Sequence, residues 1–577
     1  MTMGATASQP REQFELRSEA LGALPIVRHH LERMRVEELL GRYLGSEDGR
    51  SGPGAARAAG VVVRNLCLGR EPLYGLGEWA AGFERSLLGL GPGEAELLND
   101  DRVGRALDRL FEADRGSLLC ELVVGVIEEF EVDTSQLHND STSLALHGSY
   151  ERADGRPRAG RPTPAITRGH SKDHRPDLKQ LVWILTVARD GAVPLAHRVC
   201  DGNTADQTTH IESWDGLRRL VGRADFLYVA DSKLATREQM GHIAANGGRF
   251  VCVLPASRSE DRLLREWMRT GEPQWTEAAR RPARRGGEPP DVWSVAPPPI
   301  ASAEGHRLVW VRSSRKTELD ERARADAIGR GLRALERLAE RLRGPKCRFR
   351  EREAVAGAAR SALRAKGVEQ LVRFEIEGRV EVRHRVDSTG PGRKPHRRRL
   401  ERPRFTLRWE LDEGAIAHEA ACDGCYPLVS NDPSLTDAEL LLAYRYQPNL
   451  EKRHHLLKGV LDAAPVYLKS PARIEALFAC HFLALLLHAV VERELRRAMA
   501  RQGIDRLPLY PEARACRAPT AARVFELFVG VSRHRLLRHG ELVQVFEPKL
   551  TALQEQLLDL LGVPLGAYAS TASAPGP

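Results

Sequence analysis

The stretch from Tyr444 to Lys458, YRYQPNLEKRHHLLK, carries polar side chains at a spacing that could support chemistry. Tyr444, Glu451 and Lys458 are spaced by seven residues, which is almost two helical turns, and Gln447 follows Tyr444 at i+3. A helix would therefore present a phenol, an amide, a carboxylate and an ammonium group on one face. Pro448 indicates that the helix begins near this point, with Tyr444 on the preceding turn or across a kink.

This polar helix face has two interpretations. As an ordinary charged helix, the stretch would simply be solvated. The strongly apolar run Leu477–Val491 that follows indicates instead that the helix lies near a core. A carboxylate held there, such as that of Glu451, needs a partner, and a metal ion is one candidate. Because the stretch alone does not decide between these interpretations, the other carboxylates of the chain become important.

Two aspartates are placed by predicted strands. The segment Gln136–Leu146 is typical of a strand and contains Asp140, and the apolar segment Phe226–Ala230 predicts a short strand that ends at Asp231. Ligands of open α/β sheets collect at the carboxyl ends of strands, and Asp231 fits that rule. Each aspartate alone is more often a turn or cap residue. Their joint occurrence with Glu451 favours a functional site.

The elements around these aspartates predict a specific fold class. Their order is strand, hairpin of two strands, helix, strand, helix, strand, and the turn signal Asp190-Gly191 lies within the hairpin. This is the order of an RNase H-like α/β fold, in which three antiparallel strands precede parallel strands with helical crossovers. The predicted strands are Gln136–Leu146, Leu178–Val187, Val193–Val199, Phe226–Ala230 and Phe250–Leu254, and the predicted helices are Asp206–Val221 and Thr236–Asn246.

Changes in sequence pattern divide the chain into six parts. We expect an α/β protein with a helical N-terminal domain and a mixed-sheet core, interrupted by a β-containing insertion. The parts are a disordered tail (1–20), a helical N-terminal domain with possible DNA-end binding (21–130), the first part of the RNase H-like core (131–256), an insertion with β-strands and basic segments (257–432), the second part of the core with the Glu451 helix (433–500), and a C-terminal helical region with a mobile tail (501–577).

The composition is that of a water-soluble, multidomain protein of 577 residues. The net charge of +9 and the pI near 9.2 are compatible with a nucleic-acid partner. The segment Cys422-x-x-Cys425 is the one CxxC motif among nine cysteines, and no second pair stands at zinc-site spacing. We therefore expect reduced thiols and a role for this motif that is either structural or incidental. We expect no signal peptide and no membrane span, and therefore a cytoplasmic protein.

Three segments together resemble the bacterial DDE insertion-sequence transposases, specifically the group with a Tyr-Arg-Glu-Lys signature and a β-rich insertion before the catalytic Glu. The segments are Asn139–Ser143 (NDSTS), Val229–Lys233 (VADSK) and the helix from Tyr444 to Lys458. The stretches GHSKDHRPDLKQLVW from Gly169, GNTAD from Gly202, and Arg473–Leu495 are similar to that group as well.

The resemblance implies a metal-binding triad of Asp140, Asp231 and Glu451. Two divalent ions, Mg²⁺ or Mn²⁺, would be held by these carboxylates, because Mg²⁺ prefers hard oxygen ligands. Such an ion pair activates the nucleophile and stabilises the leaving oxygen in a displacement at phosphorus. Packed together without metal, the three carboxylates would repel one another and raise one another's pKa.

The resemblance also implies contacts to the DNA phosphate near the cut, from Tyr444 and Lys458. The signature Arg falls at position 447, where this chain has Gln447, and we assign Gln447 to the same phosphate through its amide. Arg445 or Arg453 could supply the missing positive charge.

Other charged groups have competing interpretations. His454 and His455 are adjacent on a helix and cannot both face one ion, so we expect packing or DNA contact for His454 and solvent for His455. The block Lys172–Asp177 is a charged loop, and the resemblance suggests a role beside the active site. The run Arg393–Arg404 is either a mobile solvated loop or a DNA clamp, and we favour the clamp.

The function implied is that of a cut-and-paste transposase of a bacterial insertion sequence. It would bind terminal inverted repeats and target DNA as a homodimer at the nucleoid. One alternative is a DNA-binding protein descended from such an enzyme and no longer catalytic, which Gln447 would favour. Another is a free-standing two-metal nuclease. Inverted repeats that flank the gene, with short direct duplications outside them, would favour the transposase.

Overall fold

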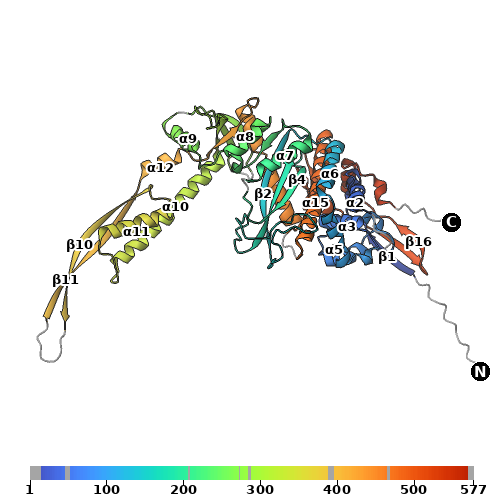
Figure 1. The fold of residues 1–577 in the computed structure, drawn as a ribbon, viewed down its shortest axis with the longest axis horizontal. Helices are drawn as coiled ribbons and strands as arrows, with labels where there is room; N and C mark the ends of the chain where they lie inside the picture. The colour runs from blue at the N-terminus through green and yellow to red at the C-terminus, as the bar shows by residue number, and fades with distance from the viewer. Residues whose placement is uncertain are drawn as a thin grey trace, which may run out of the picture. The chain divides into compact units, whose positions relative to one another are not determined.

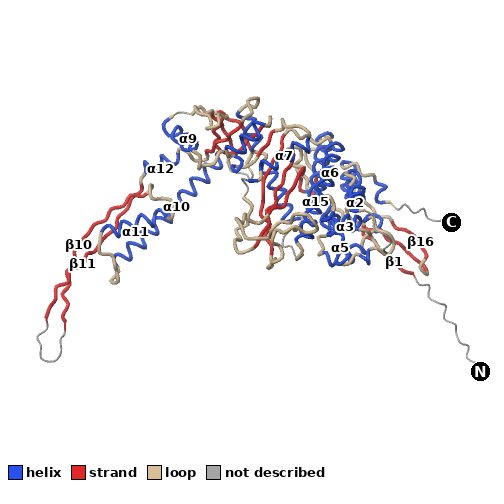
Figure 2. The backbone as a smooth tube through the Cα atoms, in the orientation of Figure 1, coloured by secondary structure: helices blue, strands red, loops and turns tan. Residues whose placement is uncertain are grey.

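The computed structural model describes residues 14–569 except 46–51, 206–207, 272, 284–287, 388–395 and 464–467. The protein is a mixed α/β chain that separates into two compact units (Figure 1). The first unit joins Met1–Val251 to Ala443–Pro577, and the second comprises Cys252–Leu442. Figure 2 shows the helices and strands of both units. The predicted insertion, residues 257–432, falls within the second unit.

The first unit is built on a mixed sheet whose strands run in the order β4-β3-β2-β5-β6. Strands β2, β3 and β4 pair antiparallel, whereas β5 and β6 continue the sheet in parallel with β2. The strands predicted between residues 136 and 254 are confirmed, and the RNase H-like assignment remains a prediction. The strands are β2 (Gln136–Leu146), β3 (Lys179–Ala188), β4 (Pro194–Cys200), β5 (Leu227–Val229) and β6 (Arg249–Val253).

Two helices connect the parallel strands. Helix α7 (His210–Val221) precedes β5, and α8 (Arg237–Ala245) precedes β6 and is capped by the Thr236 side chain. Trp214 of α7 is fully buried and packs against Phe226, with 6.0 Å between the ring centroids. Two of the residues predicted at the start of the first helix, 206 and 207, lie outside the described residues.

The N-terminal helices are α1 (Leu24–Arg33), α2 (Val36–Leu44), α3 (Ala55–Leu68), α4 (Leu76–Ala81), α5 (Asp100–Glu112) and α6 (Arg115–Phe130). Three of the N-terminal helices, α1, α3 and α5, pack on α15 (Pro471–Arg501), and all of the N-terminal helices belong to the same compact unit as α15. Arg473 of α15 binds Asp108 at 2.7 Å, and Arg115 binds Glu475 at 2.5 Å. The predicted helical N-terminal domain, residues 21–130, therefore lies in one compact unit with α15 and the sheet.

The predicted disordered tail, residues 1–20, is wrong for its last seven residues. Phe14–Ala20 form β1, which pairs antiparallel with β15 (Ser532–Arg538) from the C-terminal region. The pairing partner lies more than 500 positions away in sequence, so no local pattern could indicate it. The other C-terminal elements are β13 (Leu507–Tyr510), β14 (Arg514–Cys516), α16 (Ala521–Glu526), β16 (Glu541–Phe546) and α17 (Ala552–Leu560).

Helix α15 forms the centre of the first unit. By length and composition alone it could cross a membrane, because its most apolar 18-residue window has a mean hydropathy of 2.1. In this fold 94% of that window is buried inside the protein. A helix that is apolar all round is typical of a protein core, and here the N-terminal helices and the sheet cover it.

The second unit has an antiparallel set of strands in the order β12-β9-β8-β7. A long helix follows β9 directly, and the chain returns to the sheet only at β12. The strands are β7 (Thr276–Arg281), β8 (Asp291–Ala296), β9 (Arg307–Ser313) and β12 (Cys425–Ser430), and the short helices are α9 (Ser259–Thr270), α12 (Glu413–Ala420) and α13 (Asp437–Tyr444).

Between β9 and β12 the chain builds a module with its own core. It consists of α10 (Ser314–Arg343), α11 (Arg352–Arg364) and a two-stranded ribbon of β10 (Val372–Asp387) and β11 (His396–Leu411). The core is formed by side chains from all four elements, including Leu335, Leu342, Val355, Leu363, Ile376 and Leu407.

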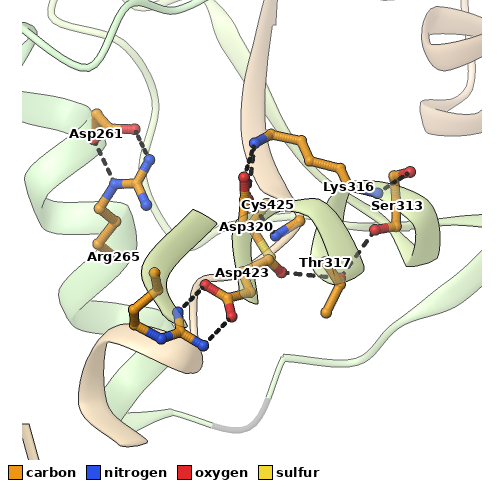
Figure 3. A network of polar contacts seen from close by, with 10 residues as sticks. Asp261, Arg265, Ser313, Lys316, Thr317, Asp320, Asp423 and Cys425 are labelled. Carbon is orange, nitrogen blue, oxygen red and sulfur yellow. Dashed lines mark hydrogen bonds and ion pairs between the residues drawn. The ribbon is translucent and has the colours of Figure 1, made fainter. Parts of the chain in front are cut away.

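A network of polar contacts holds the CxxC turn against α10 (Figure 3). Arg324 binds Asp423 through two hydrogen bonds of 2.6 and 2.7 Å, and Asp320 accepts a bond from the Gly424 amide at 2.9 Å. Cys422 and Cys425 are buried free thiols, and burial raises the pKa of Cys425 to about 12. Protonated thiols are poor metal ligands, so these contacts favour a structural role for the motif.

Gly424→Ala is expected to destabilise the fold by about 2 kcal/mol or more. Gly424 has φ of +75°, and an added Cβ would lie 2.6 Å from the carbonyl oxygen of Ser313 and in contact with Thr317. Thermal melting measures the loss. The control is Gly357→Ala in α11, where a Cβ meets nothing within 4 Å and should stabilise the helix slightly. Equal melting temperatures for the two variants would contradict the prediction.

Candidate active site

Asp140 lies in the middle of β2, opposite Leu185 of β3. Most of β2 is buried, whereas the side chain of Asp140 keeps 20% of its surface exposed. The strand therefore delivers one carboxylate to the protein surface from an otherwise buried position.

Asp231 follows β5 on the neighbouring strand. The parallel register pairs Leu137 with Tyr228 and His138 with Val229. The backbone of Asp231 is extended, with φ and ψ of −74° and −172°. If the register continued for two more residues, Asp231 would lie beside Asp140. One oxygen of Asp231 accepts a hydrogen bond from the Lys233 amide at 2.9 Å. The two predicted aspartates thus leave adjacent strands at neighbouring positions.

Helix α14 (Gln447–His455) packs on β2 and begins where Pro448 predicted. Gln447 is 7% exposed, and its amide bonds to β2 at both ends. Its oxygen bonds to the Nδ1 of His138 at 2.8 Å, and its Nε2 donates to the Asn139 carbonyl at 3.0 Å. These contacts hold the helix in register with the residues that precede Asp140.

Glu451 lies one turn further along α14. His454, at i+7 from Gln447, also faces β2, with its Nδ1 3.8 Å from an oxygen of Asp140. Glu451 is at i+4 from Gln447 and three residues before His454, so it lies on the same helix face. Unlike these two neighbours, Glu451 is exposed. The helix thus carries the third predicted carboxylate along the face that contacts the Asp140 strand.

The three carboxylates do not form a compact cluster. Across the described residues, no three His, Cys, Asp or Glu side chains lie close enough together to hold one metal ion. The donor set itself suits Mg²⁺, because all three predicted ligands offer carboxylate oxygens. Metal binding by Asp140, Asp231 and Glu451 therefore remains a prediction that rests on their placement and chemistry.

A charged loop brings a cation to Asp140. Lys172 places its Nζ 3.5 Å from an Asp140 oxygen and donates to the Ser141 hydroxyl at 2.8 Å. The next residue, Asp173, accepts a hydrogen bond from the Lys458 ammonium at 2.7 Å. Two neighbouring residues of the loop thus each contact a residue of the predicted site. The sequence indicated this loop as a possible neighbour of the active site, but not these partners.

His454 contributes no positive charge to this site at neutral pH. Burial lowers its pKa to about 3, with a further lowering from the nearby charges of Lys172 and Lys458. Its partner in sequence, His455, is exposed. The expected division between a packed and a solvated histidine is therefore what the structure shows, and Lys172 is the cation beside Asp140.

The predicted polar face is not one continuous helix. Tyr444 is the last residue of α13 and is half-buried, and α14 starts three residues later. Lys458 lies in η6, a π-helical turn at Leu456–Val460. The break and the wider turn change the angular step between residues, so the seven-residue spacing does not align these side chains as expected. Contacts of Tyr444, Gln447 and Lys458 with a phosphate remain predictions.

Gln447→Arg is expected to destabilise the fold by about 3 kcal/mol or more. Both ends of the native amide are bonded to β2, so an arginine would place an unpaired guanidinium in a buried site. Thermal melting measures the effect, with the exposed His455→Arg on the same helix as the control, expected to change stability by less than about 0.5 kcal/mol. Unchanged melting with tighter DNA binding would instead show that side chain 447 faces a phosphate.

Arg453 has a structural role, so it does not replace a phosphate-binding arginine. Its side chain is 6% exposed and binds Glu492 of α15 at 2.8 Å. It also donates to the carbonyls of Gly191 and Ala192, in the turn between β3 and β4. These contacts attach α14 to both the sheet and α15. Arg453 thus fixes the helix that carries Glu451.

A cavity of about 230 Å³ lies along β2 beyond Asp140. The hydroxyls of Ser141 and Ser143 line it together with Lys172 and Lys233, and none of its described lining residues is acidic. Hydroxyls and ammonium groups are donors to phosphate oxygens. The cavity therefore suits an anionic group that approaches the two aspartates.

Comparisons with known proteins match only part of the chain. The family described as "Domain of unknown function (DUF4277)" matches residues 16–124, which comprise β1 and most of the N-terminal helices. No curated protein matches the chain.

Solved structures of transposases show weak similarity. A piggyBac transposase synaptic complex with hairpin DNA matches with 10% identity and a TM-score of 0.26 over 49% of this chain and 60% of that chain. A pre-cleavage Mos1 transpososome matches with 9% identity and a TM-score of 0.14 over 36% and 61%, and a Mos1 paired-end complex with 12% and 0.14 over 38% and 64%. The chain thus spans less than two thirds of each of these proteins. At these TM-scores the similarity assigns no residue of this chain a role.

Proposed function

We propose that this chain is the DNA transposase of an insertion sequence, which cuts and joins DNA in a metal-dependent, cut-and-paste reaction. The observation that carries the proposal is the parallel register that pairs His138 with Val229, each two residues before one of the two aspartates, Asp140 and Asp231. Packing of the Glu451 helix on the same strand supports it. Three carboxylates from distant parts of the chain suit phosphodiester chemistry.

Each residue of the proposed site has a distinct role. Asp140, Asp231 and Glu451 would hold two Mg²⁺ or Mn²⁺ ions. When bound, such ions activate the attacking oxygen and stabilise the leaving oxygen. Lys172 and Lys458 would bind DNA phosphates in place of Asp140 and Asp173, which they contact in this structure.

The proposed partner is double-stranded DNA: the terminal inverted repeats of the element and a target. Tyr444 would add a phosphate contact near the cut, whereas both ends of the Gln447 amide are already bonded to β2. We further propose a homodimer on DNA, because two ends must be held together, and a cytoplasmic, nucleoid-associated location in a bacterium. The net charge of +9 is consistent with this partner.

A catalytically inactive DNA-binding descendant is the second candidate. It is favoured by Lys172, whose ammonium lies beside Asp140, and by the absence of a three-carboxylate cluster among the described residues. Such a protein would bind DNA equally well with and without divalent ions, and would not cleave it in either case.

Incubation with a plasmid that carries the DNA flanking both sides of the gene tests the proposal. With Mg²⁺, a transposase releases a fragment that ends at inverted repeats and joins it to a second plasmid, whereas EDTA prevents both reactions. Cleavage without end specificity or joining would indicate a free-standing nuclease. Binding without any Mg²⁺-dependent cleavage would favour the inactive descendant.

A further inference from the structure

The outer half of the β10–β11 ribbon has no core beneath it. The ribbon pairs continuously from Val372 with Leu411 to Asp387 with His396. Its inner half packs on α10 and α11 through Ile376 and Leu407. Figure 1 shows the two strands continuing side by side past α11, with no other labelled element beside their outer part. Side chains there are exposed on both faces, including Val380 at 63% and Val382 at 43%.

A two-stranded ribbon is at best marginally stable in water when neither face is covered. The inner half of this ribbon is held to the module by Arg402 and Arg404, a pair of contacts called the clamp below. Arg404 donates to the Gly344 carbonyl at 2.9 Å, and Arg402 donates to the Cys347 carbonyl at 2.6 Å. The clamp orients the outer ribbon without covering it. An exposed ribbon held at its root is suited to bind a partner that covers both faces.

The charge of the outer ribbon indicates the kind of partner. Residues directly opposite on the two strands share a face, so the register places Arg383, Arg385, Arg379 and Arg398 on one face. The opposite face carries the exposed valines and Arg399. Between the clamp and the ends of the two strands stand six arginines and three carboxylates: Arg379, Arg383, Arg385, Arg397, Arg398 and Arg399, with Glu381, Asp387 and Glu401.

We propose that the outer β10–β11 ribbon is an arm that enters the major groove of duplex DNA. The major groove, about 12 Å wide, admits a two-stranded β-ribbon. The nine residues from Arg379 to Asp387 span about 30 Å at 3.3–3.4 Å per residue, close to one turn of the duplex. With the valine face toward the base edges, the long arginine side chains of the opposite face would extend past the strand edges to phosphates on both sides of the groove.

This inference rests on the DNA partner of the proposed function, and not on cleavage. The major groove of A-form RNA is deep and narrow, and side chains cannot read it. The ribbon arm should therefore contribute to DNA binding and little to RNA-duplex binding. Comparing binding to a DNA duplex with binding to an RNA duplex therefore distinguishes entry into the major groove from a general attraction for polyanions.

The test compares the full-length chain with a shortened-ribbon variant. Residues 382–401 are replaced by Asn-Gly, so that Glu381 and Arg402 join through a two-residue hairpin turn. The clamp and the module core stay in place, and thermal melting checks the fold. Fluorescence anisotropy with a random 30-base-pair duplex measures Kd across a salt series, for DNA and for RNA of the same sequence.

We expect the shortened ribbon to weaken DNA binding at least about tenfold, and to reduce the salt slope by about three or four, one unit per lost phosphate contact. RNA-duplex binding should change less than about threefold, since the groove there is closed to the ribbon. Unchanged DNA affinity would overturn the proposal. Equal losses for DNA and RNA would overturn groove entry.

A charge-matched pair of variants keeps the test independent of the deletion. Glutamine replaces Arg379, Arg383, Arg385 and Arg398 in one variant, and four exposed arginines of α10 and α11 in the other: Arg330, Arg333, Arg337 and Arg360. The ribbon variant should lose most of the affinity that the shortened variant loses, and the helix variant little. Equal losses of DNA affinity in the ribbon variant and the helix variant would overturn the proposal that the ribbon is a DNA-binding arm. If Mg²⁺-dependent cleavage persists in all variants when DNA is supplied at high concentration, the proposed function stands even if the ribbon makes no contribution to DNA binding.

Discussion

Replacing Asp140 or Asp231 by Asn, or Glu451 by Gln, should lower Mg²⁺-dependent DNA cleavage at least about a hundredfold, because each loses a charged ligand where charge develops in the transition state. DNA binding should remain within about twofold, since it rests on cationic surfaces. The assay follows nicking of a supercoiled plasmid that carries the flanking DNA of the gene, with binding measured in parallel.

Asp225→Asn is the matched control for these three variants. Asp225 is exposed, belongs to the same unit and pairs with its neighbour Arg223 at 3.3 Å, so the change removes a carboxylate outside the proposed site. Its cleavage rate should equal that of the native chain. Normal cleavage by any one of the three site variants would remove that residue from the triad. Loss of cleavage in Asp225→Asn would show that the assay responds to net charge.

Arg453→Met should cost about 3 kcal/mol and lower the melting temperature by several degrees. The change leaves Glu492, which is 6% exposed, without the guanidinium that binds it at 2.8 Å. It also removes the donors to the carbonyls of Gly191 and Ala192. The remaining contacts of Glu492, with Arg496 at 3.5 Å and the Ala521 amide at 3.2 Å, limit the loss.

A double variant separates the buried charge from the lost packing. Arg453→Met with Glu492→Met removes both charges and should recover part of the stability, because a buried ion pair can be replaced by apolar groups at little cost. The exposed Lys452→Met on the same helix should change stability by less than about 0.5 kcal/mol. A double variant no more stable than the single one would show that the lost carbonyl contacts, and not the stranded carboxylate, dominate.

Periodicity and turn signals predict the elements of the sheet that carry Asp140 and Asp231. The reason is local: β3 is a long apolar run, and the turn at Gly191 has the left-handed backbone that its sequence requires. The pairing of β1 with β15 could not be predicted, because it joins two ends of the chain. Long-range pairing is decided by packing that no local window contains.

The carboxylates of the candidate site could be predicted from the sequence, but the residues that contact them could not. Asp140 and Glu451 stand out by residue type and position, whereas the Lys172–Asp140 contact depends on how a loop folds over β2. The expected kink before Pro448 is present, whereas the π-helical turn at Leu456–Val460 is a departure from the 3.6-residue step on which the predicted polar face rests. Arg453, one of two arginines considered as a source of the missing positive charge, instead binds the buried carboxylate of Glu492.

Because α15 covers α3 and α5, the order of synthesis matters for this protein. A ribosome completes the N-terminal helices long before it makes α15, so their apolar faces stay uncovered while the next several hundred residues are made. The α10–α11 module, which has its own core, can fold during that interval. Nascent or prematurely terminated chains that lack α15 would therefore be substrates for chaperones and proteases, and would not accumulate as soluble competitors of the full-length protein.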